Sequence, residues 1–135
     1  MILNLSHKKL NFLPSEIHNE NDITEINLSN NKIEQLDNLP KNLIKLIVNN
    51  NCIRFFNALP EKLEKLSLCD NNCEKINNLP KSLTHLSCSN NKLQILDLKG
   101  LDKLEEIHCY CNELIEIKNI PSSLKVLYCF TPLHI

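Results

Sequence analysis

A constant spacing between similar apolar segments constrains this chain more than any other feature of its sequence. Segments that read L-x-x-L-x-L-x-x-N-x-L, with Ile, Val or Cys sometimes replacing Leu, begin at Ile23, Leu43, Leu63, Leu83, Leu104 and Leu124. Their starts are 20, 20, 20, 21 and 20 residues apart, and a degenerate earlier copy runs from Leu3 to Leu10. A constant period in this range indicates a solenoid, in which each unit packs only against its neighbours.

The spacing inside each unit predicts a short strand followed by an extended return segment. The last two apolar positions of L-x-x-L-x-L are two residues apart, which is the period of a strand with one buried face. The expected inward pairs are Leu46/Val48, Leu66/Leu68, Leu86/Cys88 and Ile107/Cys109. The return segment, of only about nine residues with a proline, is too short and too interrupted for an α-helix. We expect extended or polyproline-like backbone there, with Ile33, Leu36 and Leu39 in the second wall of the core.

An asparagine ends each predicted strand, at the ninth position of the unit. These residues are Asn31, Asn51, Asn71, Asn91 and Asn112. Because an amide side chain both donates and accepts hydrogen bonds, stacked asparagines can satisfy peptide groups that are buried where the chain bends. We interpret the five residues as a structural ladder.

The units resemble the leucine-rich-repeat superfamily, and their proline signature resembles one subclass of it. Three stretches are similar to the LPxxL repeats of YopM/IpaH-type bacterial effectors: Leu39-Pro40-Lys41-Asn42-Leu43-Ile44-Lys45-Leu46 through Asn51, Leu59-Pro60-Glu61-Lys62-Leu63 through Asn71, and Leu79-Pro80-Lys81-Ser82-Leu83 through Asn91. Similar repeats occur in giant-virus proteins. The resemblance implies a leucine-rich-repeat solenoid of the right-handed β-α superhelix class, with short parallel β-strands on the concave face, extended or polyproline-like convex segments and little or no α-helix.

The same resemblance implies a function: a non-catalytic protein–protein interaction module that binds a partner protein on its concave face. It implies a viral or effector-like setting inside a host cell, and it transfers no catalytic residue. The ubiquitin-ligase domain of some effectors lies outside their repeats, and we expect a single domain here. Its units are predicted at 1–22, 23–42, 43–62, 63–82, 83–103, 104–123 and 124–135.

Charge and cysteine content bear on partners and compartment. A formal net charge of −1 and an isoelectric point near 6.5 give no field that would attract nucleic acid or an anionic membrane surface. The chain starts without a basic segment followed by a long apolar stretch, so we expect no secretory signal peptide and no membrane span. Seven cysteines, an odd number, favour a reducing compartment, and we predict a cytoplasmic location, in the host cytoplasm for a viral or effector protein.

Residues between the buried positions are expected to form three outward columns. The first column is Asn4, Asn27, Ile47, Ser67, Ser87, His108 and Tyr128; the second is Ser6, Ser29, Asn49, Cys69, Ser89, Tyr110 and Phe130; the third is Ile2, Glu25, Lys45, Lys65, His85, Glu106 and Val126. The last two units place His108, Tyr110, Tyr128 and Phe130 together, near His85 and Glu106. Since aromatic side chains supply much of the energy at interface hot spots, we predict that this group contacts the partner. The alternative is that aromatic residues stand there for their strand propensity alone.

The two ends of the solenoid suggest an alternative function. The first strand is predicted almost at Met1, and Pro132 stands where a ladder asparagine is expected. Uncapped ends leave strand edges and apolar core exposed. The alternative is therefore a structural protein that self-assembles, for example as a homodimer, through Leu3, Leu5, Leu127 or Leu133. Minimal caps formed by the terminal segments would remove that tendency.

The cysteines and histidines could suggest a metal site, a redox function or catalysis, but their positions in the repeat disfavour all three. Cys88, Cys109 and Cys129 share one inward position, where cysteine acts as a small hydrophobe. Cys69 and Cys73 have the spacing of some zinc ligands, but the frame points one outward and the other inward. Without a nucleophile beside the histidines, and with one glycine in the chain, the sequence predicts no enzyme, no cofactor and no metal. A metal-binding or redox protein is a distant third hypothesis.

Overall fold

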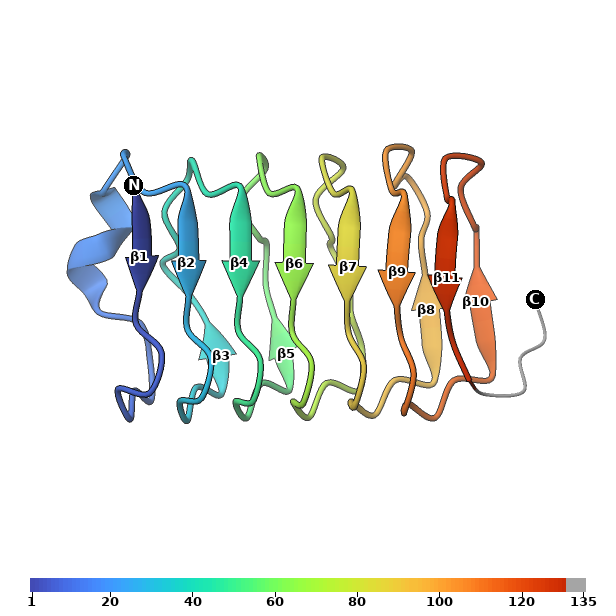
Figure 1. The fold of residues 1–135 in the computed structure, drawn as a ribbon, viewed down its shortest axis with the longest axis horizontal. Helices are drawn as coiled ribbons and strands as arrows, with labels where there is room; N and C mark the ends of the chain where they lie inside the picture. The colour runs from blue at the N-terminus through green and yellow to red at the C-terminus, as the bar shows by residue number, and fades with distance from the viewer. Residues whose placement is uncertain (131–135) are drawn as a thin grey trace.

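The structure, a computed structural model that describes residues 1–130, is a solenoid of parallel strands. One strand of each unit joins a seven-stranded parallel sheet (Figure 1). In order across the sheet these are β1 (Ile2–Asn4), β2 (Glu25–Asn27), β4 (Lys45–Ile47), β6 (Lys65–Ser67), β7 (His85–Ser87), β9 (Glu106–His108) and β11 (Val126–Tyr128). Sequential units are thus neighbours in space, as the repeat period predicted.

The strands pair in one register along the whole sheet, with no slip from unit to unit. Glu25 of β2 stands opposite Ile2 of β1 and Lys45 of β4, and the same alignment continues to Val126 of β11. Because side chains alternate between the two faces of a strand, this register stacks equivalent positions of all units into columns. The predicted columns follow directly from it.

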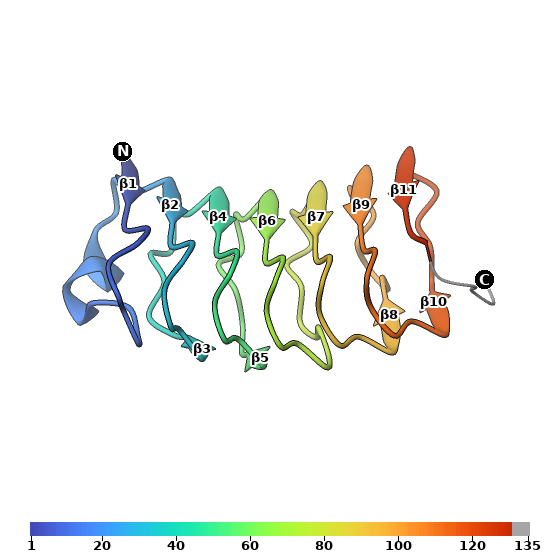
Figure 2. The same ribbon diagram turned by 60° about the horizontal axis from the view of Figure 1, so that its bottom comes forward.

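The core lies between this sheet and the return segments behind it. All predicted inward pairs of the strands are buried, and so are Ile33, Leu36 and Leu39. Figure 2 shows the two walls edge-on, with the seven strands following a shallow arc whose hollow side is the exposed face of the sheet. The predicted fold, with strands on the concave face and largely extended return segments, is confirmed.

The return segments carry a little more regular structure than the sequence predicted. The strand β3 (Gln35–Leu36) pairs with β5 (Phe55–Phe56), and β8 (Ile95–Asp97) pairs with β10 (Glu116–Lys118). The 3-10 helix η1 (Ser15–Asn19) follows Pro14 in the longer first unit. No helix within residues 1–130 is long and apolar enough to cross a membrane.

The asparagine ladder links each unit to the one before it. The Oδ1 atom of Asn51 accepts from the Ile33 N–H at 3.0 Å, while its Nδ2 donates to the carbonyls of Leu28 and Val48 at 3.0 and 3.2 Å. Asn31, Asn71, Asn91 and Asn112 make the equivalent bonds in their own units. Each side chain therefore pairs peptide groups that the bend leaves without a strand partner.

The residue just before each ladder asparagine adopts a left-handed conformation, with φ between 54° and 59°. The residues are Asn30, Asn50, Asp70, Asn90 and Cys111. Asn and Asp tolerate this conformation better than other residues with a Cβ. Cys111 is the exception among the five, and its side chain is exposed.

The ends of the sheet are less well buried than its centre. Leu3 and Leu127 occupy the same inward position as Leu46 but are only partly buried. The predictions for Pro132 and Leu133 lie outside the described residues.

Candidate functional site

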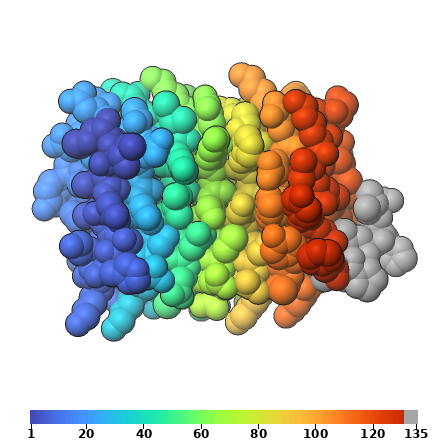
Figure 3. Space-filling view, viewed as in Figure 1, coloured from blue at the N-terminus to red at the C-terminus, as the bar shows by residue number. Residues whose placement is uncertain are grey.

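The exposed face of the seven-stranded sheet carries all six residues that the sequence assigned to partner binding. Figure 3 shows this face as one surface crossed by successive units. His85 and Glu106 are neighbours in the third column, and His108 and Tyr128 are neighbours in the first. Tyr110 and Phe130 lie two residues beyond the ends of β9 and β11.

The four aromatic rings at the C-terminal end of the sheet contact one another in pairs. Tyr110 and Phe130 stack, with centroids 5.3 Å apart and an interplanar angle of 26°. The His108 ring lies 4.7 Å from Tyr128, tilted by 37°, and 6.1 Å from Tyr110 in an edge-on arrangement. We call His108, Tyr110, Tyr128 and Phe130 the aromatic cluster. Tyr128 is 47% exposed and Phe130 is 81% exposed, so much of its apolar surface faces solvent.

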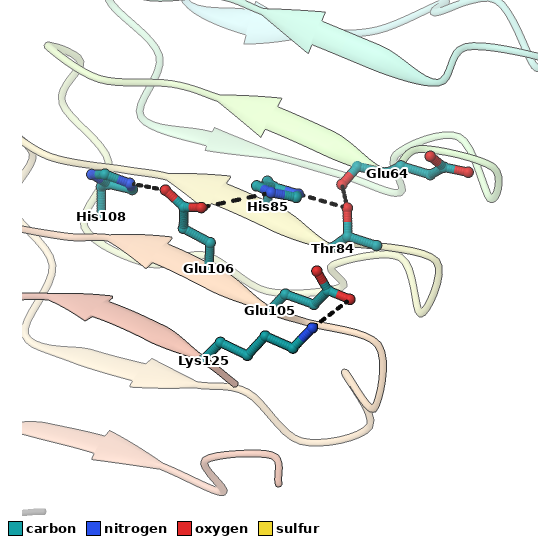
Figure 4. Close-up of polar contacts among 7 residues, drawn as sticks. All are labelled: Glu64, Thr84, His85, Glu105, Glu106, His108 and Lys125. Carbon is teal, nitrogen blue, oxygen red and sulfur yellow. Dashed lines mark hydrogen bonds and ion pairs between the residues drawn. The ribbon is translucent and has the colours of Figure 1, made fainter. Parts of the chain in front are cut away.

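A chain of polar contacts holds one side of the aromatic cluster in place (Figure 4). The Nε2 atom of His108 lies 2.5 Å from Glu106 Oε1, and its Nδ1 lies 3.2 Å from the Tyr110 hydroxyl. The other oxygen of Glu106 lies 3.7 Å from His85 Nε2. The hydrogen bond with His108 is the largest cause that lowers the pKa of Glu106, with smaller contributions from the charges of His108, His85 and Lys65. Glu106 therefore favours its ionised form, which fixes the His108 ring against Tyr128.

The N-terminal and middle units present small polar groups that are already engaged with each other. Asn27 Oδ1 accepts from the Ser29 N–H at 3.0 Å, and Asn49 Oδ1 accepts from the Ser67 hydroxyl at 2.7 Å. Ser29 and Ser89 were predicted to face solvent but are buried.

Sequence analysis placed two lysines in the third column of the same face but did not assign them to partner binding. Lys45 and Lys65 are register partners in β4 and β6, in the third column. With His85, Ser67 and Ser87 they line a shallow hollow of about 160 Å³. The sequence contains two lysines at the same strand position, 20 residues apart. A net charge of −1 for the whole chain gives no indication of this local positive charge.

Three of the seven cysteines are buried in the core: Cys73, Cys88 and Cys109. Burial raises the pKa of the Cys73 and Cys109 thiols to about 12, and burial raises that of Cys88 well above its ordinary value. Such thiols stay protonated and behave as small apolar side chains. Within residues 1–130, no group of three or more His, Cys, Asp or Glu side chains is arranged to hold a metal ion.

Solved structures with the same architecture include bacterial effectors. The leucine-rich-repeat domain of a Shigella effector matches with a TM-score of 0.71 and 26% identity, covering 98% of this chain. YopM from Yersinia pestis, a leucine-rich effector protein, matches with a TM-score of 0.69 and 27% identity over 94% of the chain. YopM from Yersinia enterocolitica gives 0.60 and 26% over 81%. The chain thus has the leucine-rich-repeat fold, and the likeness supports a relationship to the leucine-rich-repeat superfamily.

The leucine-rich-repeat chain spans 70% of the Shigella domain, but only 42% and 29% of the two YopM chains. No protein-family model matches it, and no curated protein matches it. Leucine-rich-repeat solenoids of this kind are typically protein-interaction modules, and the similar structures are effector repeat domains. The relationship therefore gives a fold and a general class of function.

Proposed function

We propose that this leucine-rich-repeat protein is a non-catalytic interaction module that binds a partner protein on the exposed face of its seven-stranded sheet. The observation that carries the proposal is the aromatic cluster, in which Tyr128 and Phe130 expose apolar surface on rings that neighbouring rings hold in place. The N-terminal half of the same face carries no Phe or Tyr in its columns; Ile2 is exposed there, beside polar groups such as Asn27 and Ser67.

Physical arguments support the cluster as an anchor. Aromatic residues are enriched among the few side chains that dominate binding energy. The cost of ordering a side chain at an interface is smaller when the ring is already packed, as Tyr110 is against Phe130. The sheet supplies enough surface, since seven strands at about 4.8 Å span roughly 30 Å, and a standard interface takes about 800 Å² per partner.

The similarity to Shigella and Yersinia effectors supports a setting inside a host cell as part of the same proposal. A cytoplasmic location belongs to it too, because the buried thiols need no oxidising compartment. The contact between Glu106 and His108 is assigned to positioning the cluster, because the His108 ring that it holds lies against Tyr128 and Tyr110.

The test compares two double variants as affinity baits in a lysate of candidate host cells. Tyr128→Ala with Phe130→Ala removes exposed rings from the cluster, whereas Phe12→Ala with Phe55→Ala removes exposed rings elsewhere. A partner that is captured by wild type and by the control, but lost with the cluster variant, supports the proposal. A partner retained by a correctly folded cluster variant would remove it.

Self-assembly through the ends is the second candidate, favoured by the incomplete burial of Leu3 and Leu127. It predicts a mass in light scattering that rises with protein concentration and falls back after Leu3→Asn or Leu127→Asn. A constant monomeric mass at micromolar concentrations would contradict self-assembly and leave the interaction module as the proposed function.

A further inference from the structure

A pair of lysines occupies two adjacent positions of the third column on the exposed face. Lys45 and Lys65 stand directly opposite each other on neighbouring parallel strands, about 4.8 Å apart along the sheet. Like charges at such positions repel and destabilise the sheet. The fold would tolerate any polar residue at these two positions. The stability of the sheet therefore does not explain why both are lysine.

Within residues 1–130, neither ammonium group forms a close ion pair. Among residues 1–130, no carboxylate oxygen lies within 4.0 Å of the Nζ atom of Lys45 or Lys65. The hydroxyl of Ser87, which lines the same hollow, makes no hydrogen bond within those residues. Two lysines and Ser87 therefore border one hollow of about 160 Å³, together with the apolar Leu46, Ile47 and Leu66, and this volume accommodates one carboxylate.

The charges on either side of the lysine pair restrict what can bind. Glu25 precedes Lys45 in the third column, and Glu106 follows His85. A polyanion laid along the column would meet both glutamates, which disfavours it. The arrangement favours one acidic side chain at one place.

We propose that the partner of this protein presents an extended acidic segment, with one Asp or Glu side chain bound between Lys45 and Lys65 and an apolar side chain on the aromatic cluster. The inference rests on the proposed function and adds the chemistry of the partner. From β6 to β11 there are three strand spacings, or about 14 Å, which an extended chain covers in about four residues. The acidic and apolar residues of the partner are thus four positions apart.

The experiment titrates the isotopically labelled protein with short peptides and follows the backbone amides by NMR. The probe is Asp-Ser-Gly-Ser-Phe, tested together with the reversed order because the direction of the segment is open. Matched peptides carry Asn or phosphoserine in place of Asp. The protein variants are Lys45→Gln with Lys65→Gln, and Lys103→Gln as a control for the loss of an exposed lysine outside the face.

The proposal expects the Asp peptide to shift amides in both the β4–β6 and the β9–β11 regions. Replacing Asp by Asn, or both lysines by Gln, should weaken binding about fivefold or more, and Lys103→Gln should not. The double lysine variant should be at least as stable as wild type, because it removes a repulsion; a mere structural role would make it less stable.

The outcomes separate this inference from the proposed function. Shifts confined to β9–β11, with equal affinity for the Asp and Asn peptides, would overturn the acidic segment and leave the aromatic cluster intact. Shifts confined to β4–β6 would keep the carboxylate site and contradict the cluster. Tighter binding of the phosphoserine peptide, or no binding by any peptide at millimolar concentration, would overturn the inference.

Discussion

The rings of Tyr110 and Phe130 stack with their centroids 5.3 Å apart although they belong to different units of the repeat. The register of β9 and β11 brings them together, because it places equivalent positions of consecutive units side by side. A repeat that slipped by one residue would send both rings to the core side and the buried leucines to solvent. The exposed cluster thus depends on the same regular pairing that forms the core.

The asparagine ladder should contribute strongly to stability. Asn71→Ala leaves the Ile53 N–H and the carbonyls of Val48 and Leu68 without their side-chain partner. Since these groups are buried, we expect a loss of roughly 2–4 kcal/mol in the free energy of unfolding, measured with urea. The exposed neighbour Asn72→Ala should change it by less than about 0.5 kcal/mol. Equal effects of the two variants would contradict the structural role of the ladder.

Cys111→Asn should stabilise the protein. Cys111 has φ at 56°, a conformation that Asn occupies in the equivalent position of earlier units, at Asn50 and Asn90. The exposed thiol has little packing to lose, so the gain should be a few tenths to about 1 kcal/mol, seen as a higher midpoint of thermal unfolding. Cys111→Ala keeps the strained conformation and should give no gain. A lower midpoint for the Asn variant than for the Ala variant would contradict this reading.

Glu106 should make stability depend on acidity. Its pKa in the folded protein lies below the ordinary 4.5, chiefly because of the hydrogen bond with His108. A lowered pKa means that the stabilisation is present above about pH 4.5 and is lost as the pH falls through the folded value. Glu106→Gln should therefore flatten the decline of the urea midpoint below that pH, while the exposed Glu74→Gln should not. An unchanged decline in Glu106→Gln would contradict the assignment.

The thiols should divide into two classes of reactivity. Burial and a pKa of about 12 keep Cys73 and Cys109 protonated and inaccessible at pH 8. Iodoacetamide followed by mass spectrometry should therefore modify the exposed Cys111 well before either of them. Comparable rates in the native protein would mean that the core opens far more readily than the close packing of its leucines indicates.

Most of the fold could be predicted because one strong pattern is repeated. The alternation that points Leu46 and Val48 inward recurs in every unit, so each copy supports the assignment of the next. The 3-10 helix Ser15–Asn19 occurs in one unit and has no such support. The pairing of β3 with β5 depends on two return segments being extended in register, which weak local preferences do not determine.

The position of the candidate site could be predicted from the sequence, but the geometry of its side chains could not. The columns follow from alternation, so the neighbourhood of His108 and Tyr128 was predictable. The ring geometry depends on side-chain rotamers, and the contact of His108 with Glu106 depends on which rotamers the neighbours leave free. Lys45 and Lys65 were placed in the third column but given no binding role, because acidic residues elsewhere bring the net charge of the chain to −1.

The central claim is that the aromatic cluster is the contact surface for a partner protein. Isothermal titration calorimetry of the purified, captured partner tests it most directly, with the Tyr128→Ala/Phe130→Ala variant compared with the Phe12→Ala/Phe55→Ala control. The loss of two hot-spot rings should raise Kd at least about tenfold in the cluster variant and leave the control within about twofold of wild type. An unchanged Kd for a cluster variant that unfolds at the wild-type midpoint would contradict the claim.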